Sequence, residues 1–252
     1  MNIEIKDSKK CEQFVQMFQY IKLFSLHVNI SFKLDNFFIQ GMDSSHISVF
    51  EILLNKEWFE NYEIETEQVI GINTNILFKI LNIRSEGQGI SLIIKEDNMD
   101  IELKGENKGE FDKYFTMPLV DIDYTELTIP DSDGNLIFSM DSKKFKMLID
   151  QFSNFGEDLT FMYENNELIV SSNNDTEGSM KININIDDME SCEVEDDLEF
   201  ESSYNLKNLL NMAQFYKITS DVYLYISLEQ PFQILYKLDE INYVRFFLAP
   251  KV

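Results

Sequence analysis

The sequence predicts an α+β protein made of two similar halves, each an antiparallel sheet covered on one face by two helices. The tetrapeptide Asp-Ser-Lys-Lys occurs at 7–10 and again at 141–144, an offset of 134, and each copy opens a run with helical period. Two further helix-like runs follow Asn73 and Asn205, at the nearly equal offset of 132. Because two helices recur at almost one spacing, the pattern indicates a duplication.

Four segments have the apolar spacing of amphipathic helices: 7–22, 73–84, 141–156 and 205–217. Their apolar residues follow the i, i+3, i+4 rule, which places them on one face of a helix. Polar residues that cap helices precede each run: Asp7 or Ser8, Asn73, Asp141 or Ser142, and Asn205.

Most of the remaining chain alternates between apolar and polar residues, as half-buried strands do. The runs 26–32 and 180–186 are the clearest, and only 4 Pro and 9 Gly interrupt the chain. We therefore expect long strands with short turns, in an N-terminal domain at 1–118 and a C-terminal domain at 134–252. The acidic segment 119–133, with Pro130 and no helical period, is expected to be an extended linker.

The composition is that of a folded protein, with 44% apolar residues and 21 Phe. The net charge of −24 taken alone argues against a nucleic-acid partner. The two cysteines, Cys11 and Cys192, lie in different halves and form no paired motif, which favours a reducing, intracellular setting. No signal segment or run long enough to cross a membrane is visible, so no membrane partner is expected.

Positive charge is concentrated on the four helical segments. Together they carry +6, which leaves −30 on the rest of the chain. Lysines on a single amphipathic helix usually do no more than face solvent, but four basic helices in so acidic a chain favour sequence-independent contact with duplex DNA. The expected contacts are Lys9, Lys10, Lys22, Lys79, Arg84, Lys143, Lys144, Lys146, Lys207 and Lys217.

The residues that catalysis or metal binding would need are missing from the pattern. There are two histidines, His27 and His46, and no zinc-type spacing. The run 187–201 holds nine acids and no base, and is interpreted as a solvated loop that repels DNA. We expect no enzyme activity, no metal and no cofactor.

Two motifs resemble the proliferating cell nuclear antigen family of DNA sliding clamps. They are Met-Asp-Ser-Ser-His at 42–46 and Leu-Ala-Pro-Lys at 248–251, and the likeness extends over the whole chain, including Leu-Thr-Ile-Pro at 127–130. The resemblance implies the DNA clamp fold, assembled into a closed homotrimeric ring that acts as a polymerase processivity factor. It also implies helices around a central hole, partner proteins that include DNA polymerase, and an ATP-dependent clamp loader.

The same resemblance implies a pocket for partner peptides and two edge strands that join subunits. Packing of the linker on its own sheet remains an alternative for Leu127 and Ile129, and an interior position remains an alternative for the edge strands. The implied interface residues are Tyr114, Met117, Met180, Ile182 and Ile184, in the segments 110–117 and 178–186. The implied pocket residues are Met42, His46, Ile47, Leu127, Ile129, Pro231, Phe247, Leu248, Ala249 and Pro250.

The sequence departs from the family at one pocket residue and in the region that carries a modified lysine in relatives. Phe247 stands where relatives commonly have Tyr, and 157–180 contains no lysine in the region where relatives are modified by ubiquitin. A subunit of a mixed-subunit checkpoint clamp, a monomeric processivity factor and a metal-dependent hydrolase are the other hypotheses. The expected location is the nucleus or a viral replication compartment.

Overall fold

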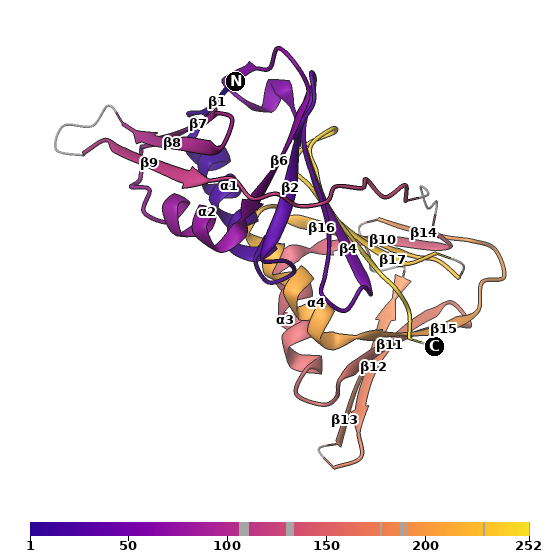
Figure 1. Cartoon of the computed structure of the whole chain (residues 1–252). Helices are drawn as coiled ribbons and strands as arrows, with labels where there is room; N and C mark the ends of the chain where they lie inside the picture. Colours follow the sequence, from indigo (N-terminus) through magenta and orange to yellow (C-terminus); the bar gives the residue numbers. More distant parts are fainter. Residues whose placement is uncertain are drawn as a thin grey trace. The chain divides into compact units, whose positions relative to one another are not determined.

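The structure is a computed structural model that describes residues 1–105, 111–129, 134–176, 178–186, 189, 191–228 and 230–251. The last four residues of the expected linker, 130–133, and Glu110 of the first expected edge segment lie outside the described residues. The chain forms two compact units (Figure 1). Unit 1 comprises Met1–Ser44, Glu51–Leu127 and Asp239–Tyr243, and unit 2 comprises Ser45–Phe50, Thr128–Leu238 and Val244–Val252.

The units differ from the expected domains because two short segments group with the other half. Ala249 N–H donates to Ile47 O at 2.9 Å, which ties the Ser45–Phe50 segment into unit 2. Asn55 N–H donates to Asn242 Oδ1 at 2.5 Å, which ties the Asp239–Tyr243 segment into unit 1. The linker is also divided, since its residues up to Leu127 belong to unit 1.

Both halves of the sequence have the same order of elements in the described part of the chain: a strand, a helix, five strands, a second helix and three strands. This order confirms the duplication. The first half contains β1 (Asn2–Ile5), α1 (Ser8–Ile21), β2 (His27–Phe32), β3 (Asn36–Met42), β4 (Ser48–Asn55), the 3₁₀ turn η1 (Lys56–Trp58), β5 (Asn61–Glu63), β6 (Gln68–Asn73), α2 (Thr74–Leu81), β7 (Gly89–Ile94), β8 (Asn98–Lys104) and β9 (Lys113–Pro118).

The second half repeats this pattern. It contains β10 (Leu136–Asp141), α3 (Ser142–Phe152), β11 (Asp158–Glu164), β12 (Glu167–Asn174), β13 (Gly178–Asn185), β14 (Cys192–Val194), β15 (Phe200–Asn205), α4 (Leu206–Ala213), the 3₁₀ turn η3 (Gln214–Lys217), β16 (Asp221–Ile226), β17 (Phe232–Lys237) and β18 (Tyr243–Leu248).

The strands of each half form two runs, a run being a series of strands hydrogen-bonded side by side. The alternation in the sequence suggested one large sheet instead. The order in the first half is β5-β1-β7-β8-β9 and β4-β3-β2-β6, and in the second half it is β14-β10-β16-β17-β18 and β13-β12-β11-β15. The two pairs of runs correspond strand for strand. The helices pack against each other and against strands of both runs, since α1 contacts β7 and α2 contacts β6 and β9.

The repeated sequence pattern places the four helix starts. The Asp7 carboxylate accepts a hydrogen bond from Lys10 N at 2.9 Å, and the Asp141 carboxylate accepts one from Lys144 N at 2.7 Å. Asn73 and Asn205 cap α2 and α4 in the same way. Each cap satisfies a backbone N–H that the helix leaves without a partner, worth about 1 kcal/mol.

Aromatic side chains fill the core under the helices. In unit 1, Phe14 lies 5.0 Å from Phe18 and 5.9 Å from Phe37 between ring centroids, and all three rings are buried. In unit 2, Phe161, Tyr204 and Phe232 form a similar cluster. Removal of a buried phenyl ring costs about 3–5 kcal/mol. The cluster of unit 1 holds α1 against β3, whereas the cluster of unit 2 joins strands β11, β15 and β17.

No helix in the described part of the chain is both long and apolar enough to cross a lipid bilayer.

Candidate functional site: basic helices, linker and edge strands

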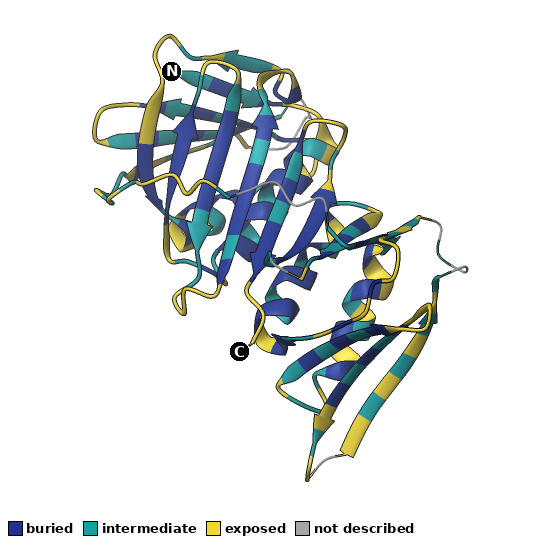
Figure 2. Cartoon of the chain, turned by 90° about the vertical axis from the view of Figure 1, so that its right-hand side faces the viewer, coloured by how far each residue is buried: buried dark blue, intermediate teal, exposed yellow. Residues whose placement is uncertain are grey.

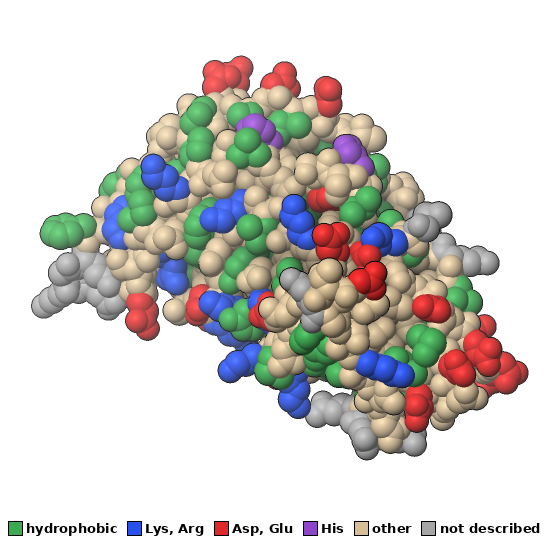
Figure 3. Space-filling model, turned by 90° about the horizontal axis from the view of Figure 1, so that it is seen from below, with side chains coloured by type: hydrophobic (Ala, Val, Ile, Leu, Met, Phe, Trp, Pro, Cys, Tyr) green, Lys and Arg blue, Asp and Glu red, His purple; other side chains and the backbone are tan. Residues whose placement is uncertain are grey.

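Six of the expected DNA-contacting lysines are exposed and make no ion pair with any described residue. Lys9 is on α1, Lys79 is on α2, and Lys207 and Lys217 lie on α4 and η3. Lys143 and Lys144 follow the cap of α3. Lys and Arg side chains reach the surface on the face shown in Figure 3. Lys217 Nζ lies 5.8 Å from the centroid of the Tyr216 ring, a contact that leaves its charge in place. A cation without an ion-pair partner remains available to a phosphate, so these six fit the expected role.

Three of the other basic residues are engaged by the chain itself. Lys10 Nζ donates to Trp58 O at 2.7 Å and lies 3.5 Å from Glu60 Oε1. Lys146 pairs with Asp150 one turn later, and its side chain is only 16% exposed. Arg84 Nη1 donates to Gln88 O at 2.8 Å. These contacts make the three residues weaker candidates for DNA contact than the sequence indicated.

Lys22 holds an intermediate position. It is the C-cap residue of α1, and its Nζ lies 4.0 Å from the centroid of the Phe78 ring on α2. A cation over a ring face keeps its charge, so Lys22 joins α1 to α2 while its positive field remains.

The linker is held on unit 1 across the polar face of β6, β2 and β3. It starts with a backbone bridge, in which Val120 N–H donates to Gly71 O at 2.9 Å. Farther on, Asn29 Nδ2 donates to Asp123 O at 3.2 Å, and Lys33 pairs with Glu126 at 3.2 Å. The interpretation that the linker packs on its own sheet is therefore confirmed as far as Leu127.

Glycine is required at the start of this crossing. A Cβ atom built on Gly71 would lie 2.2 Å from Val120 O, far inside contact distance. The linker backbone can therefore approach β6 this closely only where the strand carries no side chain.

Sequence reasoning missed the residues that hold the linker. Asn29 and Ser31 on β2 and Gln40 on β3 are buried although they are polar, and each has a hydrogen bond to the linker. Their neighbours Val28, Ile30 and others point into the core. The only signal in the sequence was an amide or hydroxyl at alternate strand positions, and a face covered by water has the same pattern.

Both expected contact strands are edge strands. β9 ends one run with β8 as its neighbour, and β13 ends another with β12 as its neighbour. β13 contains no buried residue, and Figure 2 shows an outermost strand of intermediate and exposed colour in this sheet. The interior position that the sequence left open is therefore excluded for both strands.

The interface side chains differ in their exposure. Tyr114 is 62% exposed, and Lys104 Nζ lies 5.1 Å from its ring centroid. Met180, Ile182 and Ile184 are half-buried along β13. Met117 corrects the expectation: its side chain is 1% exposed, because it pairs with the buried Met99 of β8 and points into the core.

Two family models together match almost all of the chain. The model for the proliferating cell nuclear antigen N-terminal domain matches residues 8–126, and that for its C-terminal domain matches residues 128–251. The chain belongs to the proliferating cell nuclear antigen family. Members of this family are non-enzymatic DNA sliding clamps, ring-forming processivity factors for replication and repair, and the chain is a clamp of this kind.

Individual relatives agree with the family. The chain is 27% identical over 220 residues to a proliferating cell nuclear antigen from Chaetomium thermophilum, which covers 85% of each sequence. A crystal structure of a PCNA2–PCNA3 complex from Sulfolobus tokodaii matches with a TM-score of 0.86 over 100% of this chain and 99% of that one, at 23% identity. The latter match shows that the clamp fold is the same, and the findings together do not favour the mixed-subunit checkpoint or monomeric alternatives.

Within each unit, the residues that the resemblance to proliferating cell nuclear antigen implies for a partner pocket differ in their exposure. In unit 1, Met42 is half-buried and Leu127 is 38% exposed. In unit 2, Pro231 and Ile129 are half-buried. The exposed residues of unit 2 in this set are His46, which has a positive φ of 60°, Ile47, Ala249 and Pro250.

Two of the expected pocket side chains are not offered to a partner. Leu248 is fully buried and Phe247 is 4% exposed, with the Arg245 guanidinium 5.0 Å from the Phe247 ring centroid. Phe247 and Leu248 are consecutive on β18 and therefore point to opposite faces of the strand, and both side chains are buried. Burial therefore argues against direct contact of either side chain with a peptide.

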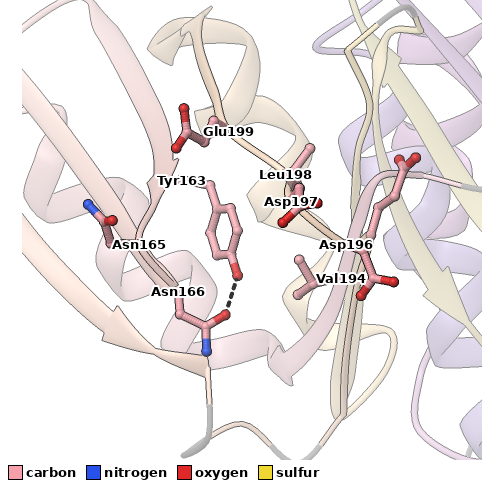
Figure 4. A pocket seen from close by; sticks show the side chains of 9 residues that line it. Tyr163, Asn165, Asn166, Val194, Asp196, Asp197, Leu198 and Glu199 are labelled. Atoms are coloured by element: carbon pink, nitrogen blue, oxygen red, sulfur yellow. Dashed lines mark hydrogen bonds between the residues drawn. The ribbon is translucent and has the colours of Figure 1, made fainter.

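Of the acidic run 187–201, residues 187, 188 and 190 lie outside the described residues, and 194–199 form one wall of a polar pocket of about 350 Å³ in unit 2 (Figure 4). Glu195, Asp196, Asp197 and Glu199 line it, and the Tyr163 hydroxyl donates to Asn166 Oδ1 at 2.9 Å. Among the residues that the structure describes, no group of three His, Cys, Asp or Glu side chains is placed to hold a metal ion. The wall is acidic and exposed, which suits a surface that repels phosphate.

Proposed function

We propose that this clamp is a homotrimeric ring in which β9 of one copy pairs with β13 of the next, closed around duplex DNA. The observation that carries the proposal is the presence of two unlike edge strands on one chain, each with a row of backbone groups that has no neighbouring strand. Such edges attract another strand unless they are blocked. Tyr114 on β9 and the half-buried Met180, Ile182 and Ile184 on β13 supply apolar area for the contact.

The six lysines without ion pairs are proposed to face the duplex. Contact with the phosphate backbone needs no reading of bases and is weakened by salt, which suits a ring that slides. DNA polymerase and other replication proteins would bind through a short peptide with aliphatic and aromatic anchors, placed beside the linker near Leu127. An ATP-dependent loader is proposed to open the ring, and the nucleus or a viral replication compartment is the proposed location.

Mass in solution tests the ring directly. Light scattering of the whole chain at micromolar concentration and several salt concentrations should give three times the chain mass. Tyr114→Ala and Ile182→Lys should each shift this mass toward the monomer. Leu34→Ala, which removes an equally exposed side chain (57%) away from both edges, should leave it unchanged.

A second measurement tests encirclement. After treatment with a loader, the protein should stay on circular DNA and leave linear DNA through its ends. A monomeric mass at all concentrations, or equal retention on circular and linear DNA, would contradict the proposal.

A further inference from the structure

The side chain of Gln40 contacts the linker backbone in the way that a neighbouring strand would. Leu127 N–H donates to Gln40 Oε1 at 2.7 Å, and Gln40 Nε2 donates to Leu127 O at 2.8 Å. Two residues of antiparallel strands exchange hydrogen bonds in the same paired manner. Because donor and acceptor both belong to Leu127, this contact selects one linker residue and hence one register.

Glu51 on β4 determines which way the Gln40 amide points. Gln40 Nε2 uses its other hydrogen to donate to Glu51 Oε1 at 2.9 Å. A flipped amide would place Gln40 Oε1 against the oxygens of both Glu51 and Leu127, which now accept from Nε2. Gln40 is 9% exposed and Glu51 is 4% exposed, and a mismatch in such a buried place would be costly.

The other linker anchors do not select a register to the same degree. Asn29 Nδ2 reaches two successive carbonyls, Ile122 O at 3.5 Å and Asp123 O at 3.2 Å. The pair of Lys33 and Glu126 is a solvent-exposed contact between flexible side chains. A shift of the linker by one residue could preserve contacts of this kind, whereas it would break both bonds to Gln40.

We infer that Gln40, oriented by Glu51, is a positioning residue that fixes the linker register and so presents the side chain of Leu127 to partner peptides. The Gln40 side chain makes two hydrogen bonds to the backbone of Leu127, while the side chain of Leu127 is 38% exposed. The inference rests on the proposed peptide site for its second half. The register itself can be measured in the free protein.

The test uses the whole chain with Gln40→Met, which keeps the length of the side chain but removes its hydrogen bonds. Glu51→Gln is the conservative variant, because it retains an oxygen that can accept from Gln40. Lys33→Ala is the matched control, since it removes an anchor of the same linker that does not select a register. Amide hydrogen exchange of 119–129 and the affinity for a peptide with aliphatic and aromatic anchors are measured, together with Tm.

We expect exchange at the Leu127 amide to accelerate about tenfold in Gln40→Met, and peptide affinity to fall about tenfold, with Tm within a few degrees of the unsubstituted protein. Glu51→Gln should retain most of the protection, and Lys33→Ala should change either readout less than twofold.

Unchanged exchange at Leu127 in Gln40→Met would overturn the inference, and so would accelerated exchange with full peptide affinity. If the unsubstituted protein binds no such peptide, the proposed partner site fails, and the exchange data still decide whether Gln40 holds the linker.

Discussion

The division of the basic residues into unpaired and paired groups can be tested on α3 alone. Lys143 and Lys144 are exposed without ion pairs, whereas Lys146, two positions farther, is paired with Asp150 and is 16% exposed. Each lysine that contacts a phosphate contributes about 0.9 to the slope of log K against log salt concentration. Replacement of both exposed lysines by Gln should therefore lower the magnitude of that slope by up to about 1.8 for each chain that contacts the duplex.

The assay is fluorescence anisotropy with a short duplex at a series of low salt concentrations. The double substitution Lys146→Gln with Asp150→Asn removes the internal pair without changing the net charge, and should leave the slope unchanged. A charge-matched control, Lys56→Gln with Lys237→Gln, removes two exposed lysines that are not on the four basic segments. If this control lowers the slope as much as Lys143→Gln with Lys144→Gln does, the reasoning from paired and unpaired side chains is refuted.

Three further predictions concern the linker, acid stability and the thiols. Gly71→Ala should speed amide exchange at Val120, because the added Cβ would meet Val120 O at 2.2 Å and displace the backbone bridge; protection equal to that of the original protein would contradict this. Although burial raises the pKa of Asp239, hydrogen bonds from the Asn242 side chain and from neighbouring backbone N–H groups outweigh it, and the pKa lies below its usual value. The Asp239 carboxylate therefore stabilises the fold at pH values above its unfolded pKa, and this contribution is lost as the pH falls through its lowered pKa in the folded protein. In the wild-type protein the unfolding free energy should fall between about pH 5 and 3, and Asp239→Asn should make this fall smaller. Urea titration at each pH measures the unfolding free energy. Burial raises the pKa of the Cys11 thiol to about 11. At pH 8 an alkylating reagent should therefore modify the half-buried Cys192 first and Cys11 only on unfolding, which peptide mass mapping would show. Early modification of Cys11 would exclude a closed core around α1.

Local features of the fold could be predicted from the sequence. The repeated Asp-Ser-Lys-Lys places a cap at Asp7 and Asp141, and the structure has both caps. Apolar spacing gave the four helices within a few residues, because the face that a helix buries depends on its own side chains. The pairing of Lys146 with Asp150 was also visible in principle, since the two are four positions apart on one helix.

Features that depend on distant segments could not be predicted. Glu60 forms an ion pair with Lys10 although 50 residues separate them in the sequence, and no residue near Lys10 indicates this pair. Alternation shows that a segment is a strand, but not which sheet it enters; the strands of one half therefore looked like a single sheet. Met117 and Leu248 fit the expected contacts by position, and their burial became apparent only from the strands packed against them.

The linker shows why a polar pattern can be ambiguous. Gln40 and Asn29 resemble the solvent-facing residues of an antiparallel strand, and each is nevertheless buried. What covers them is another part of the backbone, whose N–H and C=O groups need polar partners as water does. Only the path of the chain distinguishes the two cases.

The two edge strands are different surfaces, and this has a consequence for any assembly that they join. A contact between β9 and β13 is head-to-tail, so it has no two-fold axis, and every copy must point in the same sense around the circle. A closed circle of this kind has a front and a back that cannot be exchanged by rotation. Every linker then lies on the same side of the circle, so an enzyme bound to a linker travels along the double helix in a defined orientation.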